Sequence, residues 1–300
     1  MKPVETYTIR PSSLEALECR LRYDWAVRQH YVSIRPNDAL EFGTAIHVAL
    51  EKYYASGSDP VKVFQHWMDE KTIDVSKFQS GAGRSRKLGP RELGSRMMQN
   101  YVAEYARKEP FDIIATEQEI SRAIPIPRDE PKVVSDPSKR FFLATRIDAI
   151  VYNRVLGSHW VLEHKTFERF YPGQLDQNHQ FVIEKFVAEG WLKAPIAGVI
   201  YNGLWKRDKA TPAQPRLFQR HPIHINERQV EVMLHRIYWQ LKDLASPNYR
   251  VYPEPSSLKC QYCSFRQPCT EYMRGGDWSF LLENTYKQVD PRSLGSAEVE

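Results

Sequence analysis

Two carboxylates and a lysine in the middle of the chain have the types and spacing needed for metal-dependent chemistry. Glu163 and Lys165 end an apolar segment that begins at Trp160, and Asp148 interrupts another apolar segment earlier in the chain. Side chains alternate along an extended strand, so Glu163 and Lys165 face the same side. A carboxylate among apolar neighbours is costly unless it is paired or binds a metal. If the two segments form a hairpin, Asp148 lies beside Glu163.

Together these side chains would form an oxygen-rich site that suits Mg²⁺ or Mn²⁺. A bound divalent ion polarises a phosphodiester and lowers the pKa of bound water, while a nearby lysine positions that water or offsets the developing negative charge. The pattern therefore indicates phosphodiester hydrolysis. The alternative is a surface ion pair between Glu163 and Lys165, with Asp148 capping a turn. A second E-x-K triplet, from Glu130 to Lys132, contains proline and lies in a charged loop.

The four cysteines form a second group with chemical potential. Cys19 stands near the start of the chain, and Cys260, Cys263 and Cys269 follow one another with C-x2-C-x5-C spacing. Two disulfides are disfavoured, because no secretory signal is evident and a reducing cytosol keeps thiols free. Four thiolates can bind zinc or an iron–sulfur cluster, and the residues alone do not separate the two. Either group would join the two ends of the chain in a structural site; the alternative is buried or incidental cysteines.

The composition is that of an ordinary globular chain. Its 300 residues are 42% hydrophobic and 26% charged, which is enough to bury a core without disulfides. No run of eighteen apolar residues and no signal-like start occur, so we expect a cytoplasmic protein with no membrane partner. A net charge of +5 permits a polyanionic partner. The Walker pattern is absent, which argues against a P-loop ATPase in this chain.

The elements that must position these residues change from helical to mixed along the chain. Apolar residues at three- and four-residue steps predict helices over 10–35, 39–56, 60–74, 90–108, 173–190 and 226–245. Alternating or continuous apolar runs predict strands over 111–127, 141–153, 159–167, 196–204 and 216–225. This order favours an α/β fold with a mixed central sheet.

We expect one structural unit with four stretches. Residues 1–110 form a mostly helical part that includes Cys19, and residues 111–250 form the core. The cysteine segment occupies 251–284, and the polar residues 285–300 form a flexible tail.

The motifs resemble those of the PD-(D/E)xK nuclease superfamily, in particular RecB-like nuclease domains and the iron–sulfur nucleases associated with CRISPR adaptation and with AddB. GTAIHVALE is similar to the early helix of that family, whose histidine binds a metal, and ATEQEI resembles the strand that carries an acidic residue, here Glu117 or Glu119. RIDAI resembles the Asp motif, LEHKT the E-x-K motif, and LDQNHQFVIEKF the helix with a glutamine. The resemblance assigns metal binding to His47, Asp148, Glu163 and His164, and catalytic roles to Asp148, Glu163, Lys165 and Gln180.

Two details qualify this assignment. Alternation along the strand turns the His164 side chain away from the acids, so we expect its backbone carbonyl to be the ligand. Ile147 precedes Asp148 where the family has proline, and Glu184 occupies a position of the glutamine helix where an aromatic residue is often found.

The resemblance also implies cofactors, substrate and partners. One cysteine before the histidine helix and three after the core match the iron–sulfur members, which implies a 4Fe-4S cluster beside the Mg²⁺ or Mn²⁺ site. The implied activity is that of a DNA exonuclease acting on single strands or DNA ends in recombination, repair or phage DNA processing, with a helicase or recombination protein as partner. The alternatives are a non-catalytic DNA-binding subunit and a zinc-stabilised interaction protein.

A basic run adjoins two glycines between the helical segments. Arg84, Arg86, Lys87 and Arg91 have the charge needed to contact DNA phosphates. The alternative is a solvated charged face, which is the usual role of such a run.

Overall fold

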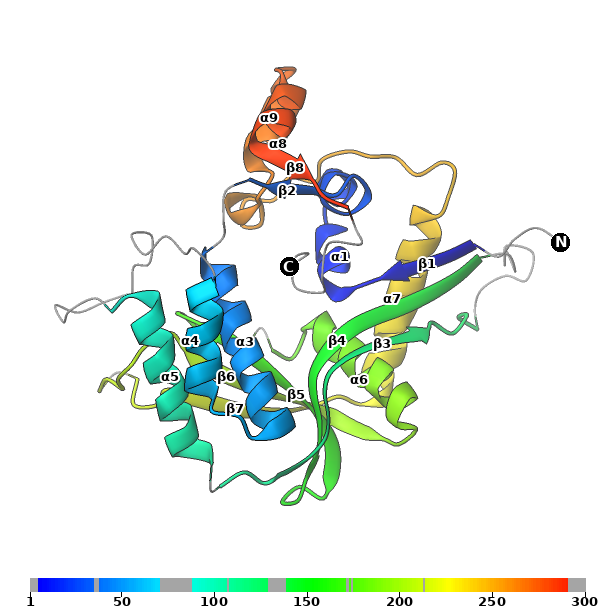
Figure 1. Cartoon of the computed structure of the whole chain (residues 1–300). Helices are drawn as coiled ribbons and strands as arrows, with labels where there is room; N and C mark the ends of the chain where they lie inside the picture. The colour runs from blue at the N-terminus through cyan, green and yellow to red at the C-terminus, as the bar shows by residue number, and fades with distance from the viewer. Residues whose placement is uncertain are drawn as a thin grey trace. The chain divides into compact units, whose positions relative to one another are not determined.

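The chain folds into two compact units, each assembled from segments that are far apart in the sequence (Figure 1). Unit 1 combines the described parts of Met1–Pro36, Ala123–Ala144 and His235–Glu300, and unit 2 combines those of Asn37–Arg122 and Thr145–Leu234. The computed structural model describes residues 5–34, 38–70, 88–106, 108–128, 139–170, 173, 175–212 and 214–290.

Unit 2 is built on a mixed sheet, as the sequence predicts. β4 and β5 form an antiparallel hairpin, β5 and β6 run parallel, and β6 and β7 are antiparallel, while β3 pairs with the other side of β4. The hairpin turn contains Gly157, whose φ of 65° is in the left-handed region that glycine adopts readily. The strands are β3 (Phe111–Ala123), β4 (Lys139–Asn153), β5 (Ser158–Phe167), β6 (Ile196–Trp205) and β7 (Phe218–His224).

A helix makes the crossover between the two parallel strands of this sheet. α6 (His179–Leu192) begins after Asn178, whose side chain accepts a hydrogen bond from the backbone N–H of Gln180. Such a cap satisfies one of the free N–H groups of the first turn. α6 therefore has a fixed start directly before Gln180, which is one of the predicted site residues.

Three helices form the other apolar part of unit 2. They are α3 (Asp38–Ser56), α4 (Pro60–Glu70) and α5 (Pro90–Tyr105), and all three begin within two residues of the predicted positions. They pack around a buried cluster that includes Phe42, Ile46 and Phe64. Gly94 of α5 lies directly against the Phe64 ring, since a Cβ atom there would be 2.0 Å from that ring.

Unit 1 joins the two ends of the chain, and here the sequence-based expectations fail in two places. The single helix expected over 10–35 is wrong: Cys19 has an extended backbone (φ −138°, ψ 114°) that ends the first helical segment. The loose tail expected from 285 is also wrong at its start, because Tyr286–Gln288 forms β8, which pairs antiparallel with β2 (Figure 1). A buried Tyr286 ring stacked on Phe265 holds this strand in place.

The elements of unit 1 are short, and most lie near the ends of the chain. β1 pairs in parallel with the first part of β4, which then continues into unit 2. The elements of unit 1 are β1 (Glu5–Ile9), α1 (Pro11–Ala16), α2 (Arg20–Tyr23), a π-helical turn (Asp24–Arg28), β2 (Tyr31–Ser33), the second half of α7 (Glu227–Leu244), α8 (Arg266–Arg274), α9 (Trp278–Thr285) and β8.

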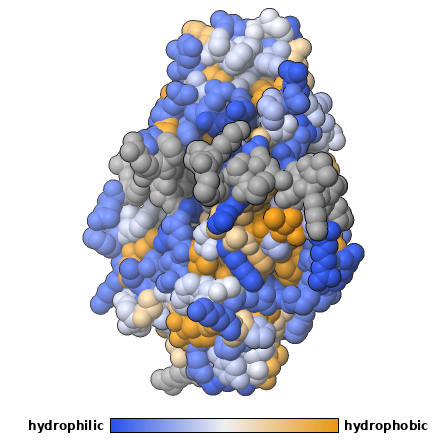
Figure 2. All heavy atoms as spheres, turned by 90° about the vertical axis from the view of Figure 1, so that its right-hand side faces the viewer, coloured by the Kyte–Doolittle hydropathy of each residue, from blue (hydrophilic) through white to orange (hydrophobic). Residues whose placement is uncertain are grey.

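No helix in the described ranges is long and apolar enough to cross a bilayer. The face drawn in Figure 2 is a mosaic of hydrophilic residues with small apolar patches between them, which is ordinary for a globular protein.

Candidate active site

The β4–β5 hairpin brings the two predicted carboxylates together. The ladder pairs Ala149 with Leu162, so Asp148 and Glu163 are the next residues on the two strands. The backbone N–H of His164 donates a 2.7 Å hydrogen bond to Oδ2 of Asp148. Glu163 is 2% exposed, and the Asp148 side chain 10%. The surface ion pair considered as an alternative does not fit this burial.

His47 and Glu117 complete a group of potential metal ligands around Asp148. Nδ1 of His47, on α3, lies 3.2 Å from Oδ1 of Asp148. One ligand atom each from His47, Glu117 and Asp148 lie within 4.8 Å of one another, and no other group of three or more His, Cys, Asp or Glu residues in the described ranges does so. Carboxylate oxygens are the donors that suit Mg²⁺ and Mn²⁺, and imidazole nitrogen suits transition metals.

Of the two acids expected on the preceding strand, Glu117 belongs to the site and Glu119 is exposed. Glu117 has a φ of 50°, which is rare for a residue in the middle of a strand. Such a local departure from the extended conformation redirects a side chain, as bulges beside active sites often do. Strand alternation alone therefore could not choose between the two acids.

The electrostatics of the site fit a bound cation. Burial would raise the pKa of Asp148, but the charge and hydrogen bond of His47 and the amide of His164 outweigh it and hold that pKa well below its usual range. Burial would lower the pKa of His47, but Asp148 outweighs it and raises that pKa to about 9. The pKa values of Glu117 and Glu163 each rise to about 7, through burial first and the charge of Asp148 second. A divalent ion would relieve this repulsion between buried carboxylates.

Lys165 and Gln180 both contact Glu163. Nζ of Lys165 lies 2.9 Å from Oε1 of Glu163, and the Gln180 side chain donates a 2.8 Å hydrogen bond to the same oxygen. Gln180 also donates to Glu184, four residues further along α6. Glu184 is fully buried, its Oε2 has no hydrogen-bond partner among the described residues, and burial raises its pKa well above the usual value.

The side chain of His164 lies on the opposite face of β5, as alternation predicts. Its ring stacks on Tyr54 at 5.5 Å between centroids, and its Nδ1 lies 2.7 Å from Nδ2 of Asn202. Burial lowers the pKa of His164 to about 3, so the imidazole is neutral and Nδ1 accepts the hydrogen bond from Asn202.

The sequence analysis did not predict the buried polar network behind β5. Arg220 of β7 donates hydrogen bonds of 2.8 and 2.7 Å to the two oxygens of Glu109 and a 3.1 Å bond to Asn202. Its guanidinium also donates to the hydroxyls of Tyr54 and Tyr101. The one sign of this network in the sequence is Asn202, a polar residue that interrupts the apolar run of β6.

The basic run gives a mixed result. Arg84, Arg86 and Lys87 lie outside the described residues. Arg91 forms a bidentate ion pair with Asp69, with N–O distances of 2.7 and 2.9 Å. Its side chain remains half exposed, so a phosphate contact would compete with this pair.

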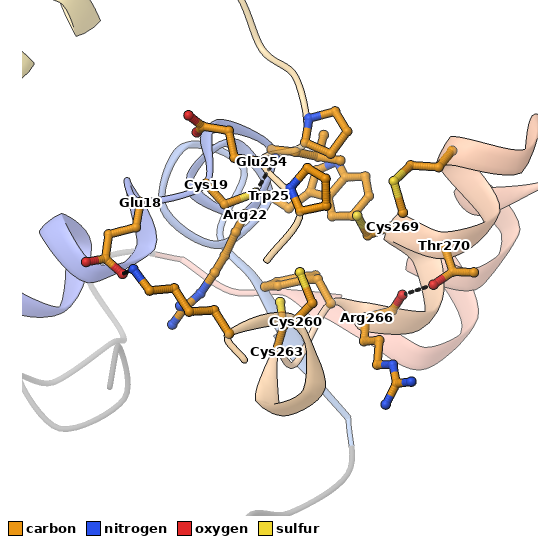
Figure 3. A pocket seen from close by; sticks show the side chains of 16 residues that line it. Glu18, Cys19, Arg22, Trp25, Glu254, Cys260, Cys263, Arg266, Cys269 and Thr270 are labelled. Carbon is orange, nitrogen blue, oxygen red and sulfur yellow. Dashed lines mark hydrogen bonds and ion pairs between the residues drawn. The ribbon is translucent and has the colours of Figure 1, made fainter. Parts of the chain in front are cut away.

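The four cysteines line one cavity in unit 1 (Figure 3). All are free thiols, and the cavity between them has a volume of about 120 Å³. The backbone N–H groups of Glu254 and Ser256 donate to the sulfurs of Cys19 and Cys260, at 3.4 and 3.2 Å. Burial and the neighbouring thiols raise the pKa of Cys269 to about 11, so holding thiolates here requires positive charge.

The sheet therefore presents buried carboxylates and a lysine at one place, and α3 adds a histidine to them. The chain belongs to the PD-(D/E)XK nuclease superfamily, whose family model matches residues 9–270. This range contains every residue of the acidic site and all four cysteines. Nucleases of this superfamily use divalent metals such as Mg²⁺, in agreement with the ligand group around Asp148. No curated protein matches the sequence.

Proposed function

We propose that the protein is a Mg²⁺- or Mn²⁺-dependent deoxyribonuclease that degrades DNA from its ends. The observation that carries this proposal is the hairpin that sets Asp148 beside Glu163, with Lys165 in contact with Glu163 and His47 in contact with Asp148. Membership of the nuclease superfamily supports it.

Each residue of the site has a distinct task in this proposal. His47, Asp148, Glu163 and the carbonyl of His164 hold the ion, and Glu117, one of the two acids that the resemblance offered, is a further ligand candidate. When bound, the ion polarises the phosphodiester and lowers the pKa of the attacking water. Lys165 positions that water and offsets the charge that develops on the phosphate oxygens. Gln180 fixes the orientation of the Glu163 carboxylate.

We also propose that the four cysteines hold a 4Fe-4S cluster. The four thiols line one cavity of unit 1, so one group could reach all of them. One cysteine before the core and three after it with C-x2-C-x5-C spacing match the iron–sulfur members that the sequence resembles. N–H donors to the Cys19 and Cys260 sulfurs are contacts that stabilise clusters. The cluster would be structural, joining Cys19 to the C-terminal segment.

The proposed cellular role and partners follow from the proposed chemistry. A nuclease that trims DNA ends acts in recombination, repair or phage DNA processing, where a helicase or another recombination protein supplies the strand. The net charge of +5 suits a DNA partner, and the basic run from Arg84 to Arg91 is proposed to contact its phosphates. We also propose a cytoplasmic location.

The decisive experiment is digestion of DNA with Mn²⁺ by the wild type and by Asp148→Ala. End-labelled linear single and double strands are compared with closed circles of the same sequence. We expect the wild type to shorten linear DNA from its ends, to leave circles intact, and to lose this activity with Asp148→Ala. Cleaved circles would overturn the exonuclease part. DNA binding without cleavage under any divalent ion would overturn the enzyme and favour a non-catalytic DNA-binding subunit.

A further inference from the structure

The sheet face that carries the catalytic residues extends beyond them in a single row. Glu163 of β5 pairs with Tyr201 of β6, and Tyr201 pairs with His221 of β7. Side chains at paired positions lie on the same face of a sheet. Neighbouring strands are about 4.8 Å apart, so His221 lies about 10 Å from Glu163 across the sheet.

The next row of the same face contains a gap. Lys165 pairs with Gly203, which has no side chain. The Phe167 ring occupies that space, because a Cβ on Gly203 would be 2.4 Å from this ring and 2.8 Å from the ring of Tyr201. Gly203 thus leaves room for the Phe167 ring on the sheet beyond Lys165.

Phe170 covers these rings after the end of β5. Its ring lies nearly parallel to Phe167, Tyr201 and His221, with centroid distances of 5.1, 5.7 and 5.2 Å and interplanar angles of 28°, 27° and 16°. Phe170 and His221 are both partly exposed, whereas Tyr201 is buried. A partly exposed set of parallel rings offers a flat surface that can receive another planar ring.

Positive charge adjoins this aromatic layer. The Arg207 guanidinium lies 4.2 Å from the centre of the Trp205 ring, and Trp205 in turn meets Phe167 edge to face at 4.5 Å. Aromatic rings for bases and cations for phosphates are the two elements of single-strand recognition.

The geometry points to a nucleobase-stacking subsite formed by Phe170 and His221, which holds an unpaired base of the DNA strand a few nucleotides from the phosphodiester being cut. The inference rests on the proposed nuclease function and names a substrate contact of the same site. Stacked nucleotides advance about 3.4 Å each, so a separation of about 10 Å corresponds to about three nucleotides. Arg207 would contact the backbone of this strand.

The test measures binding in EDTA, so that no cleavage occurs. The probes are a fluorescent oligothymidylate and a strand of the same length that lacks its bases. Phe170→Ala is expected to weaken binding of the oligothymidylate by about 5- to 150-fold and to leave binding of the abasic strand unchanged. Phe170→Trp retains tight binding, and Phe280→Ala, which removes an exposed aromatic ring from unit 1, changes neither affinity.

A second readout locates the base. A 2-aminopurine moved along the oligonucleotide should be quenched at one position by the wild type and at none by Phe170→Ala. Equal binding of the oligothymidylate by the wild type and Phe170→Ala overturns the subsite, and so does an equal loss of affinity for both strands. Digestion of end-labelled DNA by the same wild-type preparation separates the two proposals: cleavage with unchanged Phe170→Ala binding leaves the nuclease standing and removes only the subsite.

Discussion

Asn202 donates a 2.7 Å hydrogen bond to the ring of His164, the residue between Glu163 and Lys165. Asn202 is itself held by Arg220, whose Nε donates to the Asn202 side-chain oxygen. The back of β5 is therefore fixed by buried polar contacts, whereas its front presents the carboxylate and the lysine. Because a one-residue slip would exchange the two faces of the strand, these contacts help to set the register of the E-x-K motif.

Replacing Arg220 should destabilise the protein strongly. Arg220→Met removes the partner of the partly buried Glu109 carboxylate, and breaking a buried ion pair on one side costs up to about 3–5 kcal/mol. Urea unfolding followed by tryptophan fluorescence measures the loss. The matched control is Arg228→Met, whose exposed pair with Glu231 should be worth at most about 1 kcal/mol. Equal stability of the two variants would contradict a stabilising role for the network.

Glu184 should make the stability of the protein fall as pH rises. Its pKa in the folded protein is raised well above the value of 4.5 that it has when exposed, so the folded state holds a proton that the unfolded state releases. The stabilisation of the folded state by this proton is complete below about pH 4.5. Above that pH it is lost at about 1.4 kcal/mol per pH unit, until the pH passes the pKa of Glu184 in the folded protein. Glu184→Gln cannot release a proton, so it should flatten this part of the curve.

The measurement for Glu184 is the free energy of unfolding in EDTA between pH 5 and pH 8. Glu231→Gln serves as the control, because Glu231 is exposed on a helix and should leave the pH dependence as in the wild type. Identical curves for the wild type and Glu184→Gln would show that Glu184 is ionised in the folded protein.

The sequence was sufficient for those parts of the site that depend on local pattern. Alternation in two apolar segments predicts that Asp148 and Glu163 meet in a hairpin, and the helical period around His47 predicts α3. The helix that carries Gln180 was also expected, but its predicted start at 173 is wrong, because α6 begins at His179 after the Asn178 cap. Each of these features involves residues close in sequence or a single strand pairing.

What the sequence could not reveal depends on pairings over long distances. Glu109 and Arg220 are separated by 111 positions, and nothing in either segment identifies the other as its partner. The choice of Glu117 over Glu119 depends on an unusual backbone angle rather than on strand period. Cys19 interrupts a helical pattern because the chain there adopts an extended conformation, which its apolar spacing does not indicate.

Lys165 should be required for cleavage but not for folding. Lys165→Ala removes the charge next to Glu163, and loss of one group that stabilises the transition state typically lowers the rate by about 10²–10³-fold. Digestion rates with Mn²⁺ measure this effect, and circular dichroism checks the fold. Lys62→Ala, which removes an exposed lysine of α4, should cleave at the wild-type rate. Full activity of Lys165→Ala would show that the proposed site is not the catalytic one.

Cys19 should be needed to retain the proposed iron–sulfur cluster. It is the one ligand candidate that precedes the other three cysteines in the chain, so Cys19→Ser removes the link between the N-terminal segment and residues 260–269. We expect loss of iron and acid-labile sulfide from protein prepared without air, and a lower thermal unfolding temperature, because binding energy of such a group contributes to folding. Thr270→Val changes the same cavity without removing a thiol and should retain both properties. A colourless wild type that contains zinc would contradict the iron–sulfur proposal, and a Cys19→Ser variant with full iron content would contradict the role of Cys19.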